Sequence, residues 1–141
     1  MAKETGLGWT AWSVDDSGGT LRDIKDDTTS LQIALPRGVQ DATSLAVSAF
    51  ERLLLLADLS GTMAGVFDDA SNKVHDVLKS VPSQTAGREF LYTVSGQSLG
   101  VTNTPTIHVT DYQLNRAQDG SLTWSAPFVL ANGIVPAWSS A

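Results

Sequence analysis

The sequence predicts a mainly β fold with one packed α-helix. Hydrophobic and polar residues alternate along most of the chain, turn-forming residues separate these runs, and one stretch repeats its hydrophobic residues at the helical period. The chain has 141 residues, of which 42% are hydrophobic. This length is typical of one domain and is sufficient to bury a substantial core.

Five stretches of the chain are predicted strands. In residues 29–36, Leu31 and Ile33 alternate with small or polar residues, and this period of two is typical of a half-buried strand. Gly61 and Gly65 weaken a helix and favour a strand that bulges or approaches another backbone closely. The predicted strands cover residues 29–36, 59–67, 88–95, 101–110 and 121–130.

One helix is predicted over about residues 70–81. Its hydrophobic stripe repeats at i, i+3, i+4 and i+7, as expected for a helix that packs one face on a core. Asp68, Asp69 and Ser71 offer capping oxygens and negative charge at the positive end of the helix dipole, and Pro82 ends the helix. The stripe consists of Val74, Val77, Leu78 and Val81.

Residues 44–56 form a second helical candidate. Their hydrophobic residues become nearly continuous from Leu53 onward. Such a run fits a helix and a strand equally well, so the pattern leaves both interpretations open here.

The charge content limits the classes of function. Charged residues make up 17% of the chain, below the ~25% usual for soluble domains, so neighbouring copies are expected to cover part of the exterior. The formal net charge of -6 speaks against binding nucleic acid through a basic face. The chain contains no cysteine, which excludes disulfides, thiolate metal sites and a cysteine nucleophile.

Targeting signals are also missing from the sequence. The amino end lacks the apolar core of a secretion signal, and the longest strongly apolar run, residues 53–57, is too short to cross a bilayer. We therefore expect the protein to be made in a reducing cytoplasm and to reach the outside only by lysis.

No enzymatic machinery is predicted. Residues 96–100 match the G-x-S-x-G pattern of a hydrolase nucleophile, but that pattern needs a following helix and then an acid before a histidine. Here a strand-like run follows and His108 precedes Asp111, so a hairpin turn is the better interpretation. The paired aspartates lack the spacing of a calcium loop, and the two histidines lack convergent carboxylates. The sequence predicts no cofactor and no metal site.

The order of several segments resembles a known family. The segments are 14–24 (VDDSGGTLRDI), 48–53 (SAFERL), 65–70 (GVFDDA), 75–79 (HDVLK), and near the carboxyl end Asp111-Tyr112, Arg116, Asp119-Gly120 and 136–138 (PAW). This co-linear set, spanning about residues 9–138, resembles the major tail tube proteins of long, non-contractile-tailed bacteriophages (siphophages). That family is related to the tube proteins of type VI secretion.

The resemblance implies a β-sandwich with a flanking helix, which assembles into a ring with a continuous inner β-barrel. It further implies a structural virion protein of the phage tail, assembled in the host cytoplasm into stacked hexameric rings that conduct viral DNA. The implied partners are further copies of the chain, a tape-measure protein, and tail terminator and baseplate proteins. DNA would transit the lumen without specific binding, and no membrane is involved.

Residue roles follow from these expectations. The domain spans residues 1–141, with short arms at 1–12 and 132–141, and the long connection 37–52 is a candidate inter-ring loop. Aromatic residues in the arms suit interfaces. The inter-subunit or inter-ring candidates are Trp9, Trp12, Arg37, Asp41, Glu51, Arg52 and Trp138. The lumen-facing candidates, from the small polar faces of the predicted strands, are Glu89, Thr93, Thr102, Thr104 and Thr106.

Two other functions remain open on the sequence. One is a β-sandwich that binds carbohydrate or a host surface, for which aromatic residues exposed together on one sheet face would be the signal. The other is a tail terminator protein, which forms a closed ring without growing into a tube. Most aromatic residues here fall on the apolar faces of the predicted strands.

Overall fold

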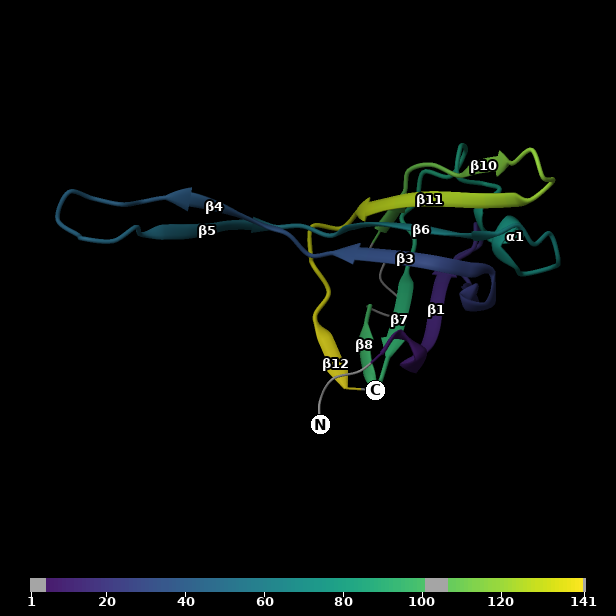
Figure 1. Cartoon of the computed structure of the whole chain (residues 1–141), viewed down its shortest axis with the longest axis horizontal. Helices are drawn as coiled ribbons and strands as arrows, with labels where there is room; N and C mark the ends of the chain where they lie inside the picture. Colours follow the sequence, from purple (N-terminus) through teal and green to yellow (C-terminus); the bar gives the residue numbers. More distant parts are fainter. Residues whose placement is uncertain (1–4, 101–106, 141) are drawn as a thin grey trace.

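Two antiparallel β-sheets pack face to face, and a separate two-stranded ribbon extends far from them (Figure 1). The computed structural model describes residues 5–100 and 107–140. Sheet A has the strand order β12-β8-β7-β1-β2, and sheet B the order β10-β11-β6-β3, with β9 also paired to β11. The mainly β prediction and the implied sandwich with one helix are therefore confirmed.

The elements have the following bounds. Sheet A comprises β1 (Trp9–Asp15), β2 (Leu21–Asp23), β7 (Phe90–Val94), β8 (Gln97–Leu99) and β12 (Trp138–Ser140). Sheet B comprises β3 (Thr28–Ala34), β6 (Ser60–Val66), β9 (Ile107–Val109), β10 (Gln113–Arg116) and β11 (Leu122–Leu130). The ribbon comprises β4 (Arg37–Asp41) and β5 (Arg52–Ala57), and the helical elements are η1 (Gly6–Gly8), η2 (Lys25–Asp27) and α1 (Val74–Leu78).

Aromatic side chains fill the space between the two sheets. Trp12 of sheet A is fully buried, and its ring centroid lies 5.9 Å from those of Phe90 and Phe128. On β11, the alternation places Trp124, Ala126 and Phe128 in the core, as the sequence predicts. Burying one such aromatic side chain contributes about 1.5–3 kcal/mol, so this cluster fixes how the sheets face each other.

Four of the predicted strands are confirmed with small shifts at their ends. They correspond to β3, β6, β7 and β11. Of the fifth, predicted over 101–110, β9 (Ile107–Val109) is present, and residues 101–106 lie outside the described part of the chain. The sequence pattern missed β1, β2, β4, β8, β10 and β12, most of them only three or four residues long, and it left β5 undecided between helix and strand.

Both glycines of β6 allow a close backbone approach, as predicted. A Cβ on Gly65 would lie 1.8 Å from the carbonyl oxygen of Asp27, and one on Gly61 would lie 2.2 Å from that of Gln32. The partner strand β3 and the turn before it therefore pack directly on the glycine backbone.

Residues 96–100 lie in a β-hairpin, as predicted. Ser95 and Gly96 both have positive φ, 49° and 78°, and they join β7 to β8 in a two-residue turn. Positive φ at both central positions is typical of a type I′ turn, whose twist matches that of the flanking strands. The G-x-S-x-G letters therefore belong to a tight turn followed by a strand.

Helix α1 is shorter than predicted. It spans Val74–Leu78 instead of about 70–81, because Asn72 has a φ of 64° and Lys73 is extended, so neither continues the helix. Val74, Val77 and Leu78 are buried as expected. The first helical N–H group is capped by Asp27, which comes from far away in the sequence (Val74 N to Asp27 Oδ2, 3.3 Å). No helix among the described residues is long and apolar enough to span a bilayer.

The carboxyl group of Asp27 yields a prediction for pH dependence. Burial and the neighbouring Asp68 carboxyl raise the pKa of Asp27 above its usual value. A raised pKa in the folded state means that stability falls as pH rises from the usual value to the raised one. Asp27→Asn keeps an oxygen for the Val74 N–H group but cannot ionise. We expect it to stabilise the fold at pH 7, where the parent chain holds a buried carboxylate at this position, and to have little effect near pH 3.

Thermal unfolding of Asp27→Asn and the parent chain at pH 3, 5 and 7 checks this expectation. Asp27→Ala is the control that removes the cap as well as the charge, and it should destabilise at every pH. Loss of stability in Asp27→Asn at pH 7 would show that the fold needs the ionised carboxylate.

The helical interpretation of residues 44–56 is wrong. This stretch contains the loop 42–51 and strand β5, whose partner β4 lies across the ribbon. A continuous run of leucines has no helical stripe, and here it forms a strand with hydrophobic residues on both faces.

Candidate assembly surface

The β4–β5 ribbon stands alone in solvent. Every residue from Leu35 to Asp58 is exposed except Ala42, which is half-buried, and no sheet or helix formed by residues 5–100 and 107–140 covers either face (Figure 1). An isolated two-stranded ribbon is marginally stable in water, because each face needs hydrophobic cover. The ribbon therefore has the properties of a segment that another molecule covers.

The ribbon carries an exceptional share of exposed hydrophobic side chains. The exposed fraction is 53% for Leu53, 61% for Leu54 and 91% for Leu56. Soluble chains that stay monomeric rarely expose such contiguous apolar surface. The full set on the ribbon and its loop is Val39, Leu45, Val47, Phe50, Leu53, Leu54, Leu55 and Leu56.

Hydrogen bonds close the far end of the ribbon. Thr43 Oγ1 donates to Asp41 Oδ1 at 2.6 Å and accepts the Glu51 N–H group at 2.9 Å. The Thr43 side chain and its backbone N–H group hold the pKa of Asp41 below its usual value. Arg52 stacks over the Phe50 ring at 5.0 Å. This loop is thus a formed structure that presents Leu45, Val47 and Phe50.

Four candidates from the sequence lie on this ribbon. Arg37, Asp41, Glu51 and Arg52 are all exposed, and Arg37 Nε donates to the carbonyl oxygen of Leu55. Two arginines balance two acids, so the ribbon carries no net charge and the charge of -6 resides in the rest of the chain.

The ribbon continues the register of sheet B. Ala34 pairs with Ser60, and three residues further along both strands Arg37 pairs with Ala57; between them the Asp58 N–H group donates to the Pro36 carbonyl oxygen at 2.9 Å. The side of β3 that faces away from β6 has no strand partner in the described residues. Such a free edge is a template for pairing with another chain.

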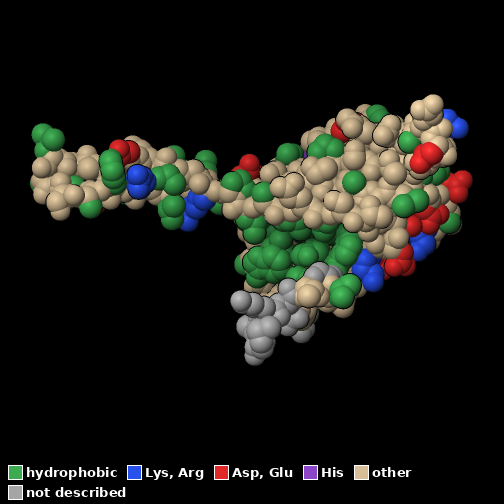
Figure 2. All heavy atoms as spheres, in the orientation of Figure 1, with side chains coloured by type: hydrophobic (Ala, Val, Ile, Leu, Met, Phe, Trp, Pro, Cys, Tyr) green, Lys and Arg blue, Asp and Glu red, His purple; other side chains and the backbone are tan. Residues whose placement is uncertain are grey.

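A hydrophobic groove lies on the body beside the base of the ribbon. It has a volume of about 280 Å³ and opens between β3 of sheet B and the β7–β12 side of sheet A. Figure 2 shows hydrophobic side chains gathered in this region, below the layer formed by sheet B. The lining residues are Leu31, Ile33, Leu35, Tyr92, Val94 and Trp138.

Trp138 lies at the rim of this groove. It is 47% exposed, and its ring meets the ring of Tyr92 edge-on at 6.2 Å. We expect Trp138→Ala to weaken self-assembly about tenfold or more while lowering the melting temperature by only a few degrees, because the exposed half of the ring adds little to the fold and is accessible to another copy. Parallel measurement of assembly concentration and melting temperature tests this. A loss of stability that accounts for the whole loss of assembly would contradict it.

The structure corrects the role of Trp12. Trp12 has no exposed surface, so it is a core residue and cannot contact another copy while the fold is intact. Trp9 is half-buried, packs 6.4 Å from Tyr92 and donates from Nε1 to the Ala11 carbonyl oxygen. Residues 9–12 thus belong to β1 inside sheet A, and residues 138–140 form its edge strand β12, so neither segment is a free arm.

Two of the lumen-facing candidates, Glu89 and Thr93, lie in the described part of the chain. Glu89 is only 9% exposed and sits beside Asp15, which does not fit a residue that lines a channel. Thr93 is half-buried on the outward face of sheet A, where its hydroxyl lies 3.0 Å from that of Ser98. Thr102, Thr104 and Thr106 lie outside the described residues.

The outward face of sheet B carries no charged side chain on β3, β6 and β11. Its residues alternate with the buried ones of β3, β6 and β11, and a groove of about 730 Å³ crosses it toward β10. The small polar character of these residues is evident from the sequence, but none of them is among the lumen-facing candidates predicted from it. The outward-facing residues are Ser30, Gln32, Ala34, Ser60, Thr62, Ala64, Val66, Thr123, Ser125, Pro127 and Val129.

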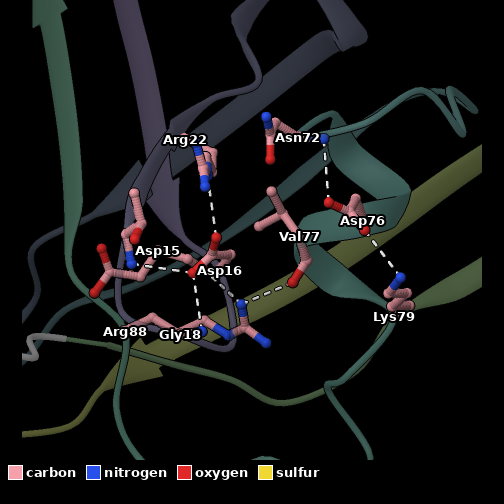
Figure 3. A network of polar contacts seen from close by, with 10 residues as sticks. Asp15, Asp16, Gly18, Arg22, Asn72, Asp76, Val77, Lys79 and Arg88 are labelled. Carbon is pink, nitrogen blue, oxygen red and sulfur yellow. Dashed lines mark hydrogen bonds and ion pairs between the residues drawn. The ribbon is translucent and has the colours of Figure 1, made fainter.

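The ionic contacts gather at the end of the body away from the ribbon, and they are structural (Figure 3). Buried Arg88 donates to the carbonyl oxygens of Asp15 (2.6 Å) and Val77 (3.0 Å), which ties β1 to α1. Burial lowers the pKa of Arg88 and raises that of Asp15. Burial also acts on Asp16, but N–H donors from Thr20 and Arg22 outweigh it and lower the pKa of Asp16.

The described part of the chain contains no cluster of three His, Cys, Asp or Glu side chains placed to hold a metal ion. His75 packs against Phe67 and its Nδ1 lies 3.1 Å from the Tyr112 hydroxyl, while His108 is exposed on β9. The candidate binding surfaces among the described residues are therefore the exposed hydrophobic ribbon, the hydrophobic groove and the unpaired edge of β3.

Comparison with known proteins finds similarity in structure only. No family model matches the chain, and no curated protein matches it. Two solved structures match over 99% of both chains: one from the virion of a native gene transfer agent particle (TM-score 0.72, 18% identity), and one from the tail of an empty gene transfer agent particle with C6 symmetry (TM-score 0.74, 19% identity). At this identity the similarity shows the fold.

Proposed function

We propose that this chain is the structural subunit of a phage-like tail tube, in which copies form hexameric rings and the rings stack into a hollow tube. The observation that carries the proposal is the exposed hydrophobic ribbon β4–β5, which no described part of its own chain covers. The same molecule offers a hydrophobic groove that fits such a segment. A protrusion and a receiving groove at different places make head-to-tail contacts, which produce rings or filaments.

The sixfold geometry rests on the similar fold in a C6-symmetric tail. In a ring of this kind, the free edge of β3 pairs with the opposite edge of sheet B in the next copy. Sheet B then continues around the ring as a barrel, and no strand edge remains exposed. The low share of charged residues agrees with a surface that other copies largely cover.

The uncharged outward face of sheet B is our choice for the wall of the bore. Hydroxyl, amide and small apolar side chains offer phosphates no fixed cations, so DNA passes without being held. Thr93 lies on sheet A and would then face away from the bore. The tape-measure, terminator and baseplate proteins are the partners expected at the inside and at the two ends of such a tube.

Electron microscopy of the purified chain over a concentration series tests the proposal. Long hollow tubes are the expected result. Closed rings that never stack would favour a terminator-type protein. Monomers at all concentrations, also after addition of preformed tail ends, would argue against self-assembly and for a binding module.

A further inference from the structure

The cross-strand pairs of the ribbon show which hydrophobic side chains lie on each of its two faces. Val39 pairs directly with Leu54, and Gln40 pairs with Leu53, so each pair shares one face. A Cβ on Gly38 would lie 3.3 Å from the Leu55 Cβ, which places Leu55 near the Gly38 side of the ribbon. One face therefore carries Val39 and Leu54, and the other carries Leu53 and Leu55.

Both faces of the ribbon carry hydrophobic side chains that need to be shielded from water. Leu53, Leu54 and Leu55 are each about half exposed in the free chain. An ordinary antiparallel pair has one hydrophobic and one solvated face, so a ribbon that is hydrophobic on both faces is enclosed from two sides. A single neighbour on one side would leave the other row of leucines in water.

The alternation along β3 and β4 shows which face extends which surface of the body. The β4–β5 register shifts by one residue between Arg37 and Val39, but the extra residue lies on β5, so the alternation on β4 continues. Residues 31, 33 and 35 face the hydrophobic side of β3, and at the same spacing 37 and 39 follow on β4. The Val39–Leu54 face thus continues the side that contains the hydrophobic groove. The Leu53–Leu55 face continues the outward, polar side of sheet B.

We infer that the two faces bind two different copies of this chain: the Val39–Leu54 face docks on the hydrophobic groove of the neighbour within the ring, and the Leu53–Leu55 face is covered by a copy in the adjacent ring. This inference rests on the proposed function. The occupant is the chain itself because the ribbon has no net charge, so the acidic bodies do not repel it, and the groove beside its own base is open and hydrophobic.

Two matched sets of variants test the inference. Leu54→Ser removes the first face, and the double variant Leu53→Ser/Leu55→Ser removes the second. All three leucines lie in solvent in the free chain, so the melting temperature of both variants should match that of the parent chain. The readouts are native mass spectrometry for rings and electron microscopy for tubes.

Leu54→Ser should raise the concentration needed for ring formation by about tenfold or more, which leaves monomers at concentrations where the parent chain assembles. The double variant should form rings that do not stack. Identical behaviour of the two variants, or the reverse assignment, would overturn the inference. Normal tubes from both would also overturn it and would point to a different protein as the occupant of the ribbon.

Cross-linking supplies an independent readout, because the chain has no cysteine of its own. Chains with Leu54→Cys are mixed with chains carrying Val94→Cys in the groove, and a short bismaleimide is added during assembly. Mixed dimers are expected with Leu54→Cys, and far fewer with the control Leu53→Cys. Equal yields would contradict the face assignment. If the parent chain assembles normally, either failure concerns only this inference; if it never assembles, the proposed function fails.

Discussion

A chain in which an Asn-Gly turn replaces residues 37–57 will fold and will not assemble. Pro36 and Asp58 already face each other across the ribbon base, with the Asp58 N–H group bonded to the Pro36 carbonyl oxygen, so a two-residue turn can join them. The core loses nothing, since no residue of the ribbon belongs to it. We expect a melting temperature within a few degrees of that of the parent chain, and no rings or tubes at any concentration.

Mixtures of the shortened chain with the parent chain give a second test. It retains the groove and the β3 edge, so it should bind to growing ends without offering a ribbon to the next copy. Small amounts should therefore shorten the tubes formed by the parent chain, which electron microscopy measures directly. Full-length tubes assembled from the shortened chain alone would show that the ribbon is not the assembly element.

The second large effect is expected at Arg88. Arg88→Ala leaves the carbonyl oxygens of Asp15 and Val77 without their buried donor, and it removes the positive charge that lies near the buried Asp15 carboxyl. Unpaired buried polar groups cost about 1–3 kcal/mol each, so we expect a loss of about 3 kcal/mol or more in the free energy of unfolding. Urea unfolding followed by tryptophan fluorescence measures it.

Arg22→Ala is the matched control. Arg22 makes a partly exposed ion pair with Asp16 at 3.1 Å, and pairs of this kind contribute about 0–1 kcal/mol. A similar loss for the two variants would contradict the structural role assigned to the Arg88 contacts.

The sequence predicts the centre of the fold better than its edges. The strict alternation on β11 and the paired glycines on β6 have physical causes that lie within one strand, so both were predictable. Strand β1 was missed because its alternation of apolar and polar residues is broken where Ala11 and Trp12 are adjacent, next to the shift of register between Trp9 and Ala11. The short strands β8, β10 and β12 contain only three or four residues, too few for any period.

The two helical predictions, for residues 70–81 and 44–56, differ from the structure because of contacts that are distant in the sequence. The left-handed conformation of Asn72 cuts α1 short, and its cap comes from Asp27, 47 residues away. The leucine run 53–56 shows no alternation of hydrophobic and polar residues, because both of its faces are hydrophobic and no described element of the chain packs on either face. The same missing cover explains why the sequence located the ribbon as a long connection, with Arg37, Asp41, Glu51 and Arg52, without recognising its leucines as the binding surface.

The proposed channel wall could not be predicted from the sequence for a different reason. The sequence reveals several small polar faces, but alternation alone assigns no face to a lumen. Glu89 is almost fully buried, and the face with Ser30, Thr62 and Ser125 is the one we propose for the wall, because sheet B is continuous with the ribbon. That choice depends on sheet order and register, which a single sequence does not contain.

A cryo-electron microscopy reconstruction of the assembly formed by the purified chain tests directly whether the ribbon builds a tube. We expect a hollow tube with sixfold symmetry, in which the ribbon 37–57 of each copy is buried between other copies and sheet B lines the bore. An assembly in which the ribbon remains exposed to solvent, or a chain that stays monomeric under all conditions, would contradict this expectation.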